Sequence, residues 1–334
     1  MMNKTREIYD SLLQELQEKT IGPDKIISRK YTSSNGIGLI YSVFSGERMR
    51  ALAIPSDKTL SETQFPVWKG VKIYLASMPE YDDPSRTYIV LQQITGTEAY
   101  IFEIVVENLR RVVETLSSSK GTADTVLNVL KKWEFFFSHG RVPLLTASEA
   151  QGLYGELLFL EGLIQRFGLN AVNTWYSEKN THDFYIGQHG VEVKTSDKQA
   201  PYYAHINSEY QLDDSDVNGH LYLKMYALRS DRSGGQKLSE LIWNIRDLLK
   251  SDIAVLNIFD KKLETLGYFD AAEDYYYTGY TLRDVYLFEV KPGFPRLVKK
   301  DIPNGIYHIE YDISISEGMN YAVEDDEFFR KLEE

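Results

Sequence analysis

The stretch that decides the fold spans residues 181–195 and reads THDFYIGQHGVEVKT. In its middle, two glycines flank the polar residues Gln188 and His189, and such a cluster is typical of a hairpin turn. We therefore expect the chain to reverse over residues 187–190 and to form two antiparallel strands. The expected register pairs residue 186 with 191, 185 with 192, 184 with 193, and 183 with 194.

Side chains along each strand alternate between two faces, and this alternation separates the hairpin residues by chemistry. One face receives the apolar side chains of Phe184, Ile186, Val191 and Val193. The other face receives Asp183, Glu192 and Lys194. Opposed Cβ atoms of paired strands lie about 5 Å apart and diagonal ones about 7–8 Å, so the two carboxylates can hold one cation between them. The hairpin therefore predicts a buried apolar face and a polar face with two acids and one lysine.

This polar face suits the hydrolysis of phosphodiester bonds. The reaction needs a divalent cation that stabilises charge on the phosphate and makes a bound water acidic. Mg²⁺ prefers oxygen ligands at about 2.1 Å, usually one or two carboxylates together with waters and substrate phosphate. Asp183 and Glu192 are the predicted carboxylate ligands, and the Val193 carbonyl is the predicted third ligand. Lys194 can orient or help to deprotonate the attacking water and offset developing negative charge.

The elements around the hairpin follow from periodicity and capping signals. Ser148 and Gln151 have the spacing of a capping box, and an apolar stripe then predicts a helix that ends at Gly168. Gly152 and Gly155 are expected to let this helix approach the sheet closely. A short strand is expected at 171–176, a helix from 207 or 208 that includes Gln211, a strand at 221–228 and a helix at 238–249. The order is helix, three strands, helix, strand, helix.

The N-terminal part is expected to be rich in β-structure and closed by helices. A helix is predicted at 4–17, strands at 36–44, 50–54, 71–77, 87–92 and 99–102, and helices at 104–117 and 123–137. Strands return at 285–290 and 305–315. We therefore predict an N-terminal module at 1–145 with a structural or target-binding role, a catalytic core at 146–250, and a C-terminal α/β extension at 251–334.

The hairpin motif resembles that of the PD-(D/E)XK nuclease superfamily, the fold of many type II restriction endonucleases. The resemblance rests on Asp183, an eight-residue interval and Glu192-Val193-Lys194, with His182 in place of the proline that names the motif. The expected order of elements is similar to that superfamily's αβββαβ core. The wider pattern adds Gly155-Glu156, Trp175 and Gln211-Leu212. It resembles a little-characterised family of bacterial PD-(D/E)XK proteins associated with restriction-type defence systems.

The resemblance implies a mixed α/β (α+β) protein with a restriction-endonuclease-like αβββαβ core. It also implies an endonuclease that uses Mg²⁺ or Mn²⁺ to hydrolyse the phosphodiester bonds of DNA. Double-stranded DNA is the expected partner, and a homodimer or restriction-system partner proteins fit the same class. The first alternative is a catalytically inactive member of the fold that binds nucleic acid or a partner protein. The second is an interaction protein with an ion-paired hairpin.

Residues outside the hairpin are secondary candidates. Glu156 lies among apolar residues of the predicted helix, where a carboxylate needs a partner, and superfamily members often place a glutamate there. It is the fourth candidate catalytic residue, expected to point towards Asp183 and Glu192. Gln211 is a candidate contact to phosphate or to a metal-bound water. Lys198 and Arg296 are candidate phosphate contacts, with simple surface charge as the alternative.

A second set of residues, Asp284, Glu289 and Lys291, also fits the pattern of an aspartate followed by E-x-K. We reject it because a continuous strand without a turn separates Asp284 from Glu289. The two acids would lie on opposite faces of that strand.

Composition limits the remaining classes of function. The 334-residue chain is 43% hydrophobic with 24 Tyr and 15 Phe, which supports a sizeable folded core. It has no cysteine, and therefore no thiolate metal site or disulfide. No apolar run has the roughly 18 residues of a membrane span, so a cytoplasmic protein is expected. The net charge of −12 disfavours binding to nucleic acid by broad phosphate neutralisation, but it does not exclude metal-assisted cleavage.

Overall fold

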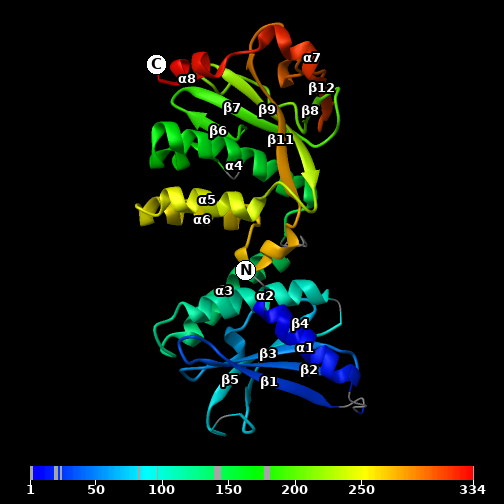
Figure 1. The fold of residues 1–334 in the computed structure, drawn as a ribbon, viewed down its shortest axis with the longest axis vertical. Helices are drawn as coiled ribbons and strands as arrows, with labels where there is room; N and C mark the ends of the chain where they lie inside the picture. Colours follow the sequence, from blue (N-terminus) through cyan, green and yellow to red (C-terminus); the bar gives the residue numbers. More distant parts are fainter. Residues whose placement is uncertain are drawn as a thin grey trace. The chain divides into compact units, whose positions relative to one another are not determined.

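The structure, a computed structural model, describes residues 3–18, 22, 25–81, 83–95, 97–138, 144–176 and 181–333, without the side chains of 135–138. The chain forms two compact units (Figure 1). Unit 1 comprises Met1–Leu144 and Phe269–Asp274, and unit 2 comprises Leu145–Tyr268 and Tyr275–Glu334. The hairpin that the sequence singles out lies in unit 2.

Unit 1 is built on a five-stranded antiparallel sheet in the order β1-β2-β3-β5-β4. Its strands are β1 (Ile26–Thr32), β2 (Gly38–Phe44), β3 (Arg50–Pro55), β4 (Val71–Ser77) and β5 (Thr87–Gln93). The last four confirm predicted strands. The sequence analysis misses β1, because the side chains of this edge strand are all exposed or half-buried and show no apolar alternation.

The helices of unit 1 are α1 (Lys4–Glu18), α2 (Ala99–Glu114) and α3 (Thr122–Ser138), and a 3₁₀ turn, η1, spans Glu62–Gln64. The strand predicted at 99–102 is wrong, because these residues form the first turn of α2. All residues from Ile101 to Val106 are buried, so this part of the helix lacks the polar face that a periodicity argument requires.

Unit 2 is built on a mixed five-stranded sheet in the order β10-β11-β9-β7-β6. Its strands are β6 (Phe184–Ile186), β7 (His189–Ser196), β9 (Leu221–Asp231), β10 (Gln236–Lys237) and β11 (Gly279–Val290). β7 and β9 are parallel, and the other neighbours are antiparallel. A separate two-stranded sheet pairs β8 (Tyr203–Ile206) with β12 (Tyr311–Ser314).

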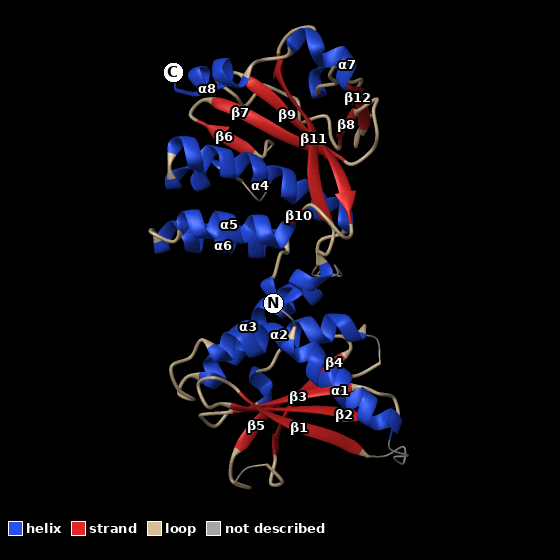
Figure 2. Ribbon diagram, viewed as in Figure 1, coloured by secondary structure: helices blue, strands red, loops and turns tan. Residues whose placement is uncertain are grey.

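The helices of unit 2 are α4 (Ala147–Phe167), α5 (Leu238–Leu249), α6 (Ile253–Leu266), α7 (Ile315–Gly318) and α8 (Asp325–Glu333). Its short 3₁₀ segments are η2 (Leu169–Thr174), η4 (Lys299–Asp301) and η5 (Met319–Tyr321), whereas η3 (Asp270–Tyr275) belongs to unit 1 except for its last residue. Figure 2 shows α4 beside β6 and β7, with α5 and α6 on the other side of α4. On the opposite sheet face, Leu223 and Met225 of β9 pack against β8 and β12.

The hairpin forms with a register that differs from the predicted one by two residues. Phe184 pairs with Val191, Tyr185 with Gly190 and Ile186 with His189, so the turn consists of Gly187 and Gln188. Gly187 has a φ of +61°, which suits glycine in such a turn. Because side chains alternate with a period of two, an offset of two leaves every residue on its predicted face. The four apolar residues of the hairpin are buried as predicted.

Three local predictions in unit 2 are wrong. The capping box of α4 uses Thr146 and Glu149, two residues before the predicted pair. The segment predicted as a strand at 171–176 is mainly the 3₁₀ helix η2, after which Trp175 forms a single bridge to Phe184. Residues 208–212 form turns in place of a helix. There the Gln211 Oε1 atom accepts a hydrogen bond from the Asn207 N–H (2.8 Å), which competes with helical bonding.

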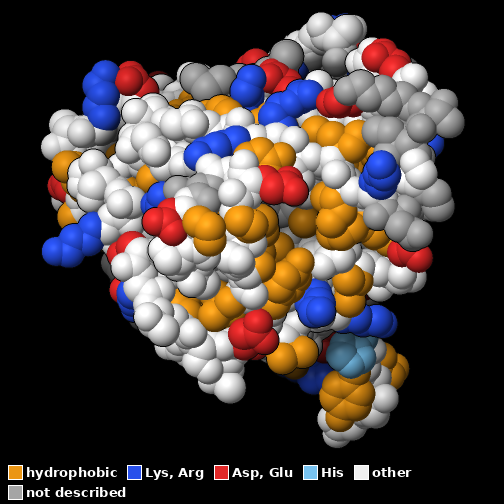
Figure 3. All heavy atoms as spheres, turned by 90° about the horizontal axis from the view of Figure 1, so that it is seen from below, with side chains coloured by type: hydrophobic (Ala, Val, Ile, Leu, Met, Phe, Trp, Pro, Cys, Tyr) orange, Lys and Arg blue, Asp and Glu red, His pale blue; other side chains and the backbone are white. Residues whose placement is uncertain are grey.

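Charge is mixed over the face of the molecule shown in Figure 3, where acidic and basic side chains are interspersed and neither sign forms a continuous patch. Apolar side chains lie between them. None of the helices in the described part of the chain is long and apolar enough to cross a membrane.

Candidate active site

The structure brings the two hairpin acids face to face. Since Phe184 pairs with Val191, Asp183 stands directly across from Glu192. β6 is paired with β7 only as far as Phe184, and Trp175 forms a bridge to Phe184 on the other edge of β6. The Tyr176 N–H donates to the Asp183 carbonyl (2.9 Å) on that same edge. The acids therefore lie where β6 and β7 stop exchanging main-chain hydrogen bonds.

Glu192 is the most buried member of the site, with a side chain only 1% exposed. The Lys194 Nζ atom lies 2.8 Å from Glu192 Oε1, which is an ion-pair distance. Neither carboxylate oxygen receives a hydrogen bond of normal geometry from the described residues. Burial, followed by the nearby Asp183 charge, raises the pKa of Glu192 to about 8. The site thus holds a buried carboxylate beside the Lys194 ammonium group.

Asp183 uses one oxygen to bond the partner strand. The Val193 N–H donates to Asp183 Oδ2 (2.8 Å), in the position that the next bond of the ladder would occupy. Burial raises the pKa of Asp183, although the Lys194 charge and this hydrogen bond oppose the shift. The N–H and carbonyl of one residue leave an extended strand on the same side. The Val193 carbonyl is therefore directed to the same side as Asp183, as a third metal ligand requires.

Glu156 approaches the two hairpin acids from α4. The Trp175 indole Nε1–H donates to Glu156 Oε2 (2.8 Å). Burial, followed by the charges of Asp183 and Glu192, raises the pKa of Glu156 well above its usual value. Three carboxylates and one lysine thus influence one another within this region. Their negative charge exceeds what Lys194 alone can balance.

A glycine brings α4 close to β7. A methyl group on Gly155 would overlap Thr195 Cγ2 and lie 3.6 Å from Val193 Cγ1. Gly155 therefore allows the close approach that was predicted for it. The same prediction for Gly152 is wrong, because a methyl group there would meet no atom within 4 Å.

Two neighbouring side chains hold the ammonium group of Lys194 in place. Its Nζ donates to the Gln211 Oε1 (2.9 Å) and pairs with Glu192. Burial opposes the charged form, but the Glu192 and Asp183 carboxylates outweigh it and raise the lysine pKa. Lys194 is therefore a cation at neutral pH. Gln211, which the sequence suggests as a contact to phosphate or to a metal-bound water, orients this lysine from the turn after β8.

The donor set fits a hard divalent cation. Among the residues that the structure describes, no three histidine, cysteine, aspartate or glutamate side chains form a preformed metal-binding cluster. Asp183 and Glu192 provide two carboxylates, which is the usual number for Mg²⁺ when waters and substrate phosphate complete its shell. The Glu192 carboxylate is also buried, and a bound cation would stabilise its charged form.

Comparison with known families bears on the whole chain. Residues 6–316 match the family model described as “Putative PD-(D/E)XK family member, (DUF4420)”. The chain belongs to the DUF4420 family. No curated protein and no solved structure matches it. The family match confirms the superfamily resemblance and the mixed α/β fold class that the sequence predicts.

Other residues named from the sequence lie outside this site in the DUF4420 protein. Lys198 is exposed, four residues beyond Lys194. Arg296 is bound within the protein, where its guanidinium donates to the Leu212 carbonyl (2.6 Å) and to Asp214 (2.9 Å). It stabilises the turn that carries Gln211, and we do not assign it to phosphate. In the rejected second motif, Glu289 pairs with Lys291 and His220, while Asp284 bonds Tyr202.

The sequence analysis does not identify two groups of contacts that support the site. His182 is buried beside Asp183, and its Nε2 lies 3.2 Å from Asp216, which also accepts a hydrogen bond from Tyr185 (2.6 Å). Lys262 of α6 donates to the carbonyls of Val172 and Trp175, and burial lowers its pKa to about 8. The first group connects the hairpin to the 213–219 loop, and the second holds the segment that carries Trp175. Neither has a local sequence signal, because the partners are far apart in the chain.

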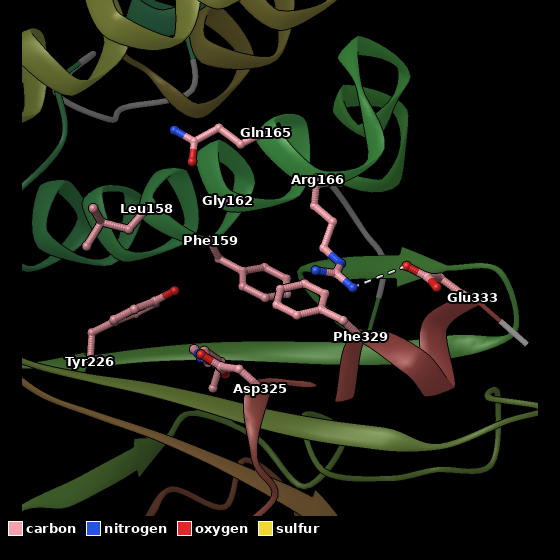
Figure 4. A pocket seen from close by; sticks show the side chains of 10 residues that line it. Leu158, Phe159, Gly162, Gln165, Arg166, Tyr226, Asp325, Phe329 and Glu333 are labelled. Carbon is pink, nitrogen blue, oxygen red and sulfur yellow. Dashed lines mark hydrogen bonds and ion pairs between the residues drawn. The ribbon is translucent and has the colours of Figure 1, made fainter. Parts of the chain in front are cut away.

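A pocket of the DUF4420 protein lies elsewhere in unit 2. It has a volume of about 680 Å³ and is lined by residues of α4, β9 and α8. Figure 4 shows its lining, with Arg166 paired to Glu333 and stacked on Phe329. Lys224 also lines it and pairs with Asp325 (3.0 Å). Lys224 neighbours Val193 in the sheet and therefore lies on the face opposite Glu192. We base the candidate site on its chemistry and not on cavity size.

Proposed function

We propose that this DUF4420 protein is a Mg²⁺- or Mn²⁺-dependent endonuclease that hydrolyses phosphodiester bonds. One observation carries the proposal. Asp183 lies across from Glu192 beside Lys194 at the point where two paired strands separate, and Glu156 of α4 is close enough for its charge to act on both acids. An ordinary ion-paired hairpin needs one acid for one lysine and would not place two more acids near it.

Each residue of the site has a proposed role that follows from its position. Asp183, Glu192 and the Val193 carbonyl would hold the cation, which when bound offsets phosphate charge and acidifies a water. Lys194, fixed by Gln211, would orient the attacking water and stabilise the negative charge that develops on phosphate. Glu156, held by Trp175, would position a second water or accept a proton from it.

We infer DNA as the substrate and a restriction-type defence system as the setting, in keeping with the superfamily resemblance. Double-stranded DNA is the class usually cut by restriction endonucleases, and a cut in both strands would favour a homodimer. The two hairpin carboxylates and the lysine are the part of this proposal that can be tested directly.

Cleavage and metal binding should be measured on the same preparations. The substrates are plasmid, linear duplex and single-stranded DNA, each in Mg²⁺ or Mn²⁺. We expect the wild type to cut some of these substrates and not others. Lys194→Ala should lose cleavage and still bind metal, because both carboxylates remain. Asp183→Asn should lose cleavage and bind metal more weakly. Lys250→Ala is the control, since it removes an exposed lysine of the same unit that follows α5, outside the hairpin, and should leave cleavage unchanged.

Two outcomes would redirect the proposal. If Lys194→Ala cuts as fast as the wild type, the roles assigned here are wrong. If the wild type binds metal and nucleic acid but cuts none of the substrates, the protein is a non-catalytic member of the fold.

A further inference from the structure

Three exposed tyrosines lie on β8, in the turn after it and in the loop before β12, and the proposed chemistry uses none of them. Tyr203 of β8 is 44% exposed, Tyr210 in the following turn 49%, and Tyr307 in the loop before β12 64%. Tyr307 has the highest exposure of any tyrosine in the described chain. Single exposed aromatic residues are common on protein surfaces, so the exposure of Tyr307 is informative together with the groups around it.

The loop before β12 projects its apolar side chains outward. Ile306 is 47% exposed beside Tyr307. Two residues around them have left-handed backbone, Gly305 with a φ of +95° and His308 with a φ of +58°. A positive φ is uncommon for a residue other than glycine and is often found where a loop has a function. The backbone therefore maintains an exposed aromatic tip.

A cation lies against this tip. The Lys299 Nζ atom is 4.2 Å from the centre of the Tyr307 ring and donates to the Ile306 carbonyl (3.3 Å). Lys300 is also exposed. A flat aromatic ring beside a lysine provides a surface for a nucleobase together with a charge for its phosphate.

Hydrogen bonds connect this loop to the candidate site. The Ile309 N–H donates to Glu209 (3.3 Å), a buried side chain in the turn after β8. Two residues later, Gln211 accepts the hydrogen bond from Lys194. The aromatic loop and the lysine of the site are thus anchored to the same short turn. In Figure 1, β8 and β12 lie side by side at one edge of unit 2.

The charge of the protein limits what this surface can bind. The net charge of −12 disfavours duplex binding by phosphate neutralisation over a broad surface. The cluster itself contains Glu209 and Asp312. Stacking on unpaired bases depends less on a broad basic surface, because much of the affinity comes from the base faces.

We propose that Tyr307, with Tyr210 and Lys299, binds the unpaired bases of a nucleic-acid strand that leads to the Lys194 site. This proposal deepens the proposed function and rests on it for the role of the bound strand. The substrate is then single-stranded or locally opened nucleic acid, in place of the uniform duplex that the family resemblance suggests.

The test is equilibrium binding of a fluorescent dT oligonucleotide and of a hairpin duplex of equal length, measured by anisotropy in a Lys194→Ala background that prevents cleavage. We expect the dT oligonucleotide to bind more tightly. Tyr307→Ala should weaken its binding by about 5- to 150-fold, as expected for the loss of one stacked base. Tyr307→Phe should retain binding, and Tyr210→Ala should give a smaller loss.

Trp243→Ala is the matched control. Trp243 is also exposed, at 50%, and also lies against a cation, since Arg246 is 4.7 Å from the centre of its ring. It lies on α5, a different element from the loop that carries Tyr307. This variant should bind as the parent does, and thermal melting should show that every variant is folded.

The proposal is overturned if Tyr307→Ala binds the oligonucleotide as the parent does, if Trp243→Ala loses as much affinity, or if the parent prefers the duplex. Its failure is distinguishable from failure of the proposed function, which the cleavage assay decides. If the protein cleaves nucleic acid but neither binding nor cleavage depends on Tyr307, only the proposed aromatic surface is refuted. If binding depends on Tyr307 but the wild type never cleaves, only the proposed catalysis is refuted.

Discussion

Replacing Gly155 by alanine tests the closest approach between α4 and the sheet. The new methyl group would come well within 3.0 Å of Thr195 Cγ2, a separation that real Cβ atoms essentially never show. Overpacking of this kind typically costs about 1–3 kcal/mol. Alanine also raises helix propensity over glycine by about 1 kcal/mol, which offsets part of that cost.

A second glycine in the same helix provides a control for the gain in helix propensity that alanine brings. Gly152→Ala gains the same propensity and meets no atom within 4 Å, so it should stabilise the protein. In urea unfolding, we expect Gly155→Ala to be about 1–3 kcal/mol less stable than Gly152→Ala. Because Gly155 precedes Glu156, Gly155→Ala should also reduce cleavage more than Gly152→Ala does.

A compensating change makes the prediction sharper. Thr195→Ser removes the Cγ2 atom that the new methyl group would meet, and it keeps the hydroxyl that bonds Gln151 (3.2 Å). The double variant should recover most of the stability lost by Gly155→Ala, so the double-mutant cycle should show coupling between the two positions. Equal stability of Gly155→Ala and Gly152→Ala, or no coupling with Thr195→Ser, would refute the described packing of α4 on β7.

Further predictions concern the charged groups. Burial raises the pKa of Glu192 from 4.5 to about 8, so without metal the folded protein keeps a proton that the unfolded chain releases. The melting temperature of the protein should therefore fall as pH rises from about 5 to 8. Glu192→Gln should make the melting temperature depend less on pH. Mg²⁺ binding should strengthen by up to about tenfold per pH unit below pH 8 and then level off, as isothermal titration would show. Trp175→Phe removes the donor to Glu156 and should cost about 1–3 kcal/mol in urea unfolding, with Trp243→Phe as the neutral control; equal losses would contradict the assigned hydrogen bond. Asp216→Ala, measured against Ser215→Ala, should cost about 1 kcal/mol, because Asp216 is partly exposed and its bonds to His182 and Tyr185 are screened by water.

The two-residue period of a strand explains why the polar face of the hairpin was predictable. Asp183, Glu192 and Lys194 occupy positions of fixed parity, so even a register error of two residues leaves them on one face. The turn itself was harder to locate, since glycines at 187 and 190 allow either a two-residue or a four-residue connection.

Tertiary contacts decide what the sequence could not predict. Gln211 lies in a turn because its side chain bonds Asn207 and Lys194, and a helix prediction sees only the local residues. Asp216 and Lys262 support the site from segments far along the chain. The sequence predicts that Gly155 lets α4 approach the sheet, but no spacing within α4 reveals that Thr195 is the residue it meets.

The parallel pairing of β7 with β9 has a consequence for the order of folding. The hairpin of β6 and β7 closes over a two-residue turn, whereas β9 can pair with β7 only after residues 197–220 have crossed over. Local contacts form early and cheaply, and long-range parallel pairing forms late. The acid pair is therefore assembled early, while Gln211, carried on the crossover, reaches Lys194 late. A nascent or partly folded chain would hold the acids in place before its lysine is oriented, so competence for cleavage would arise only with the last stage of folding.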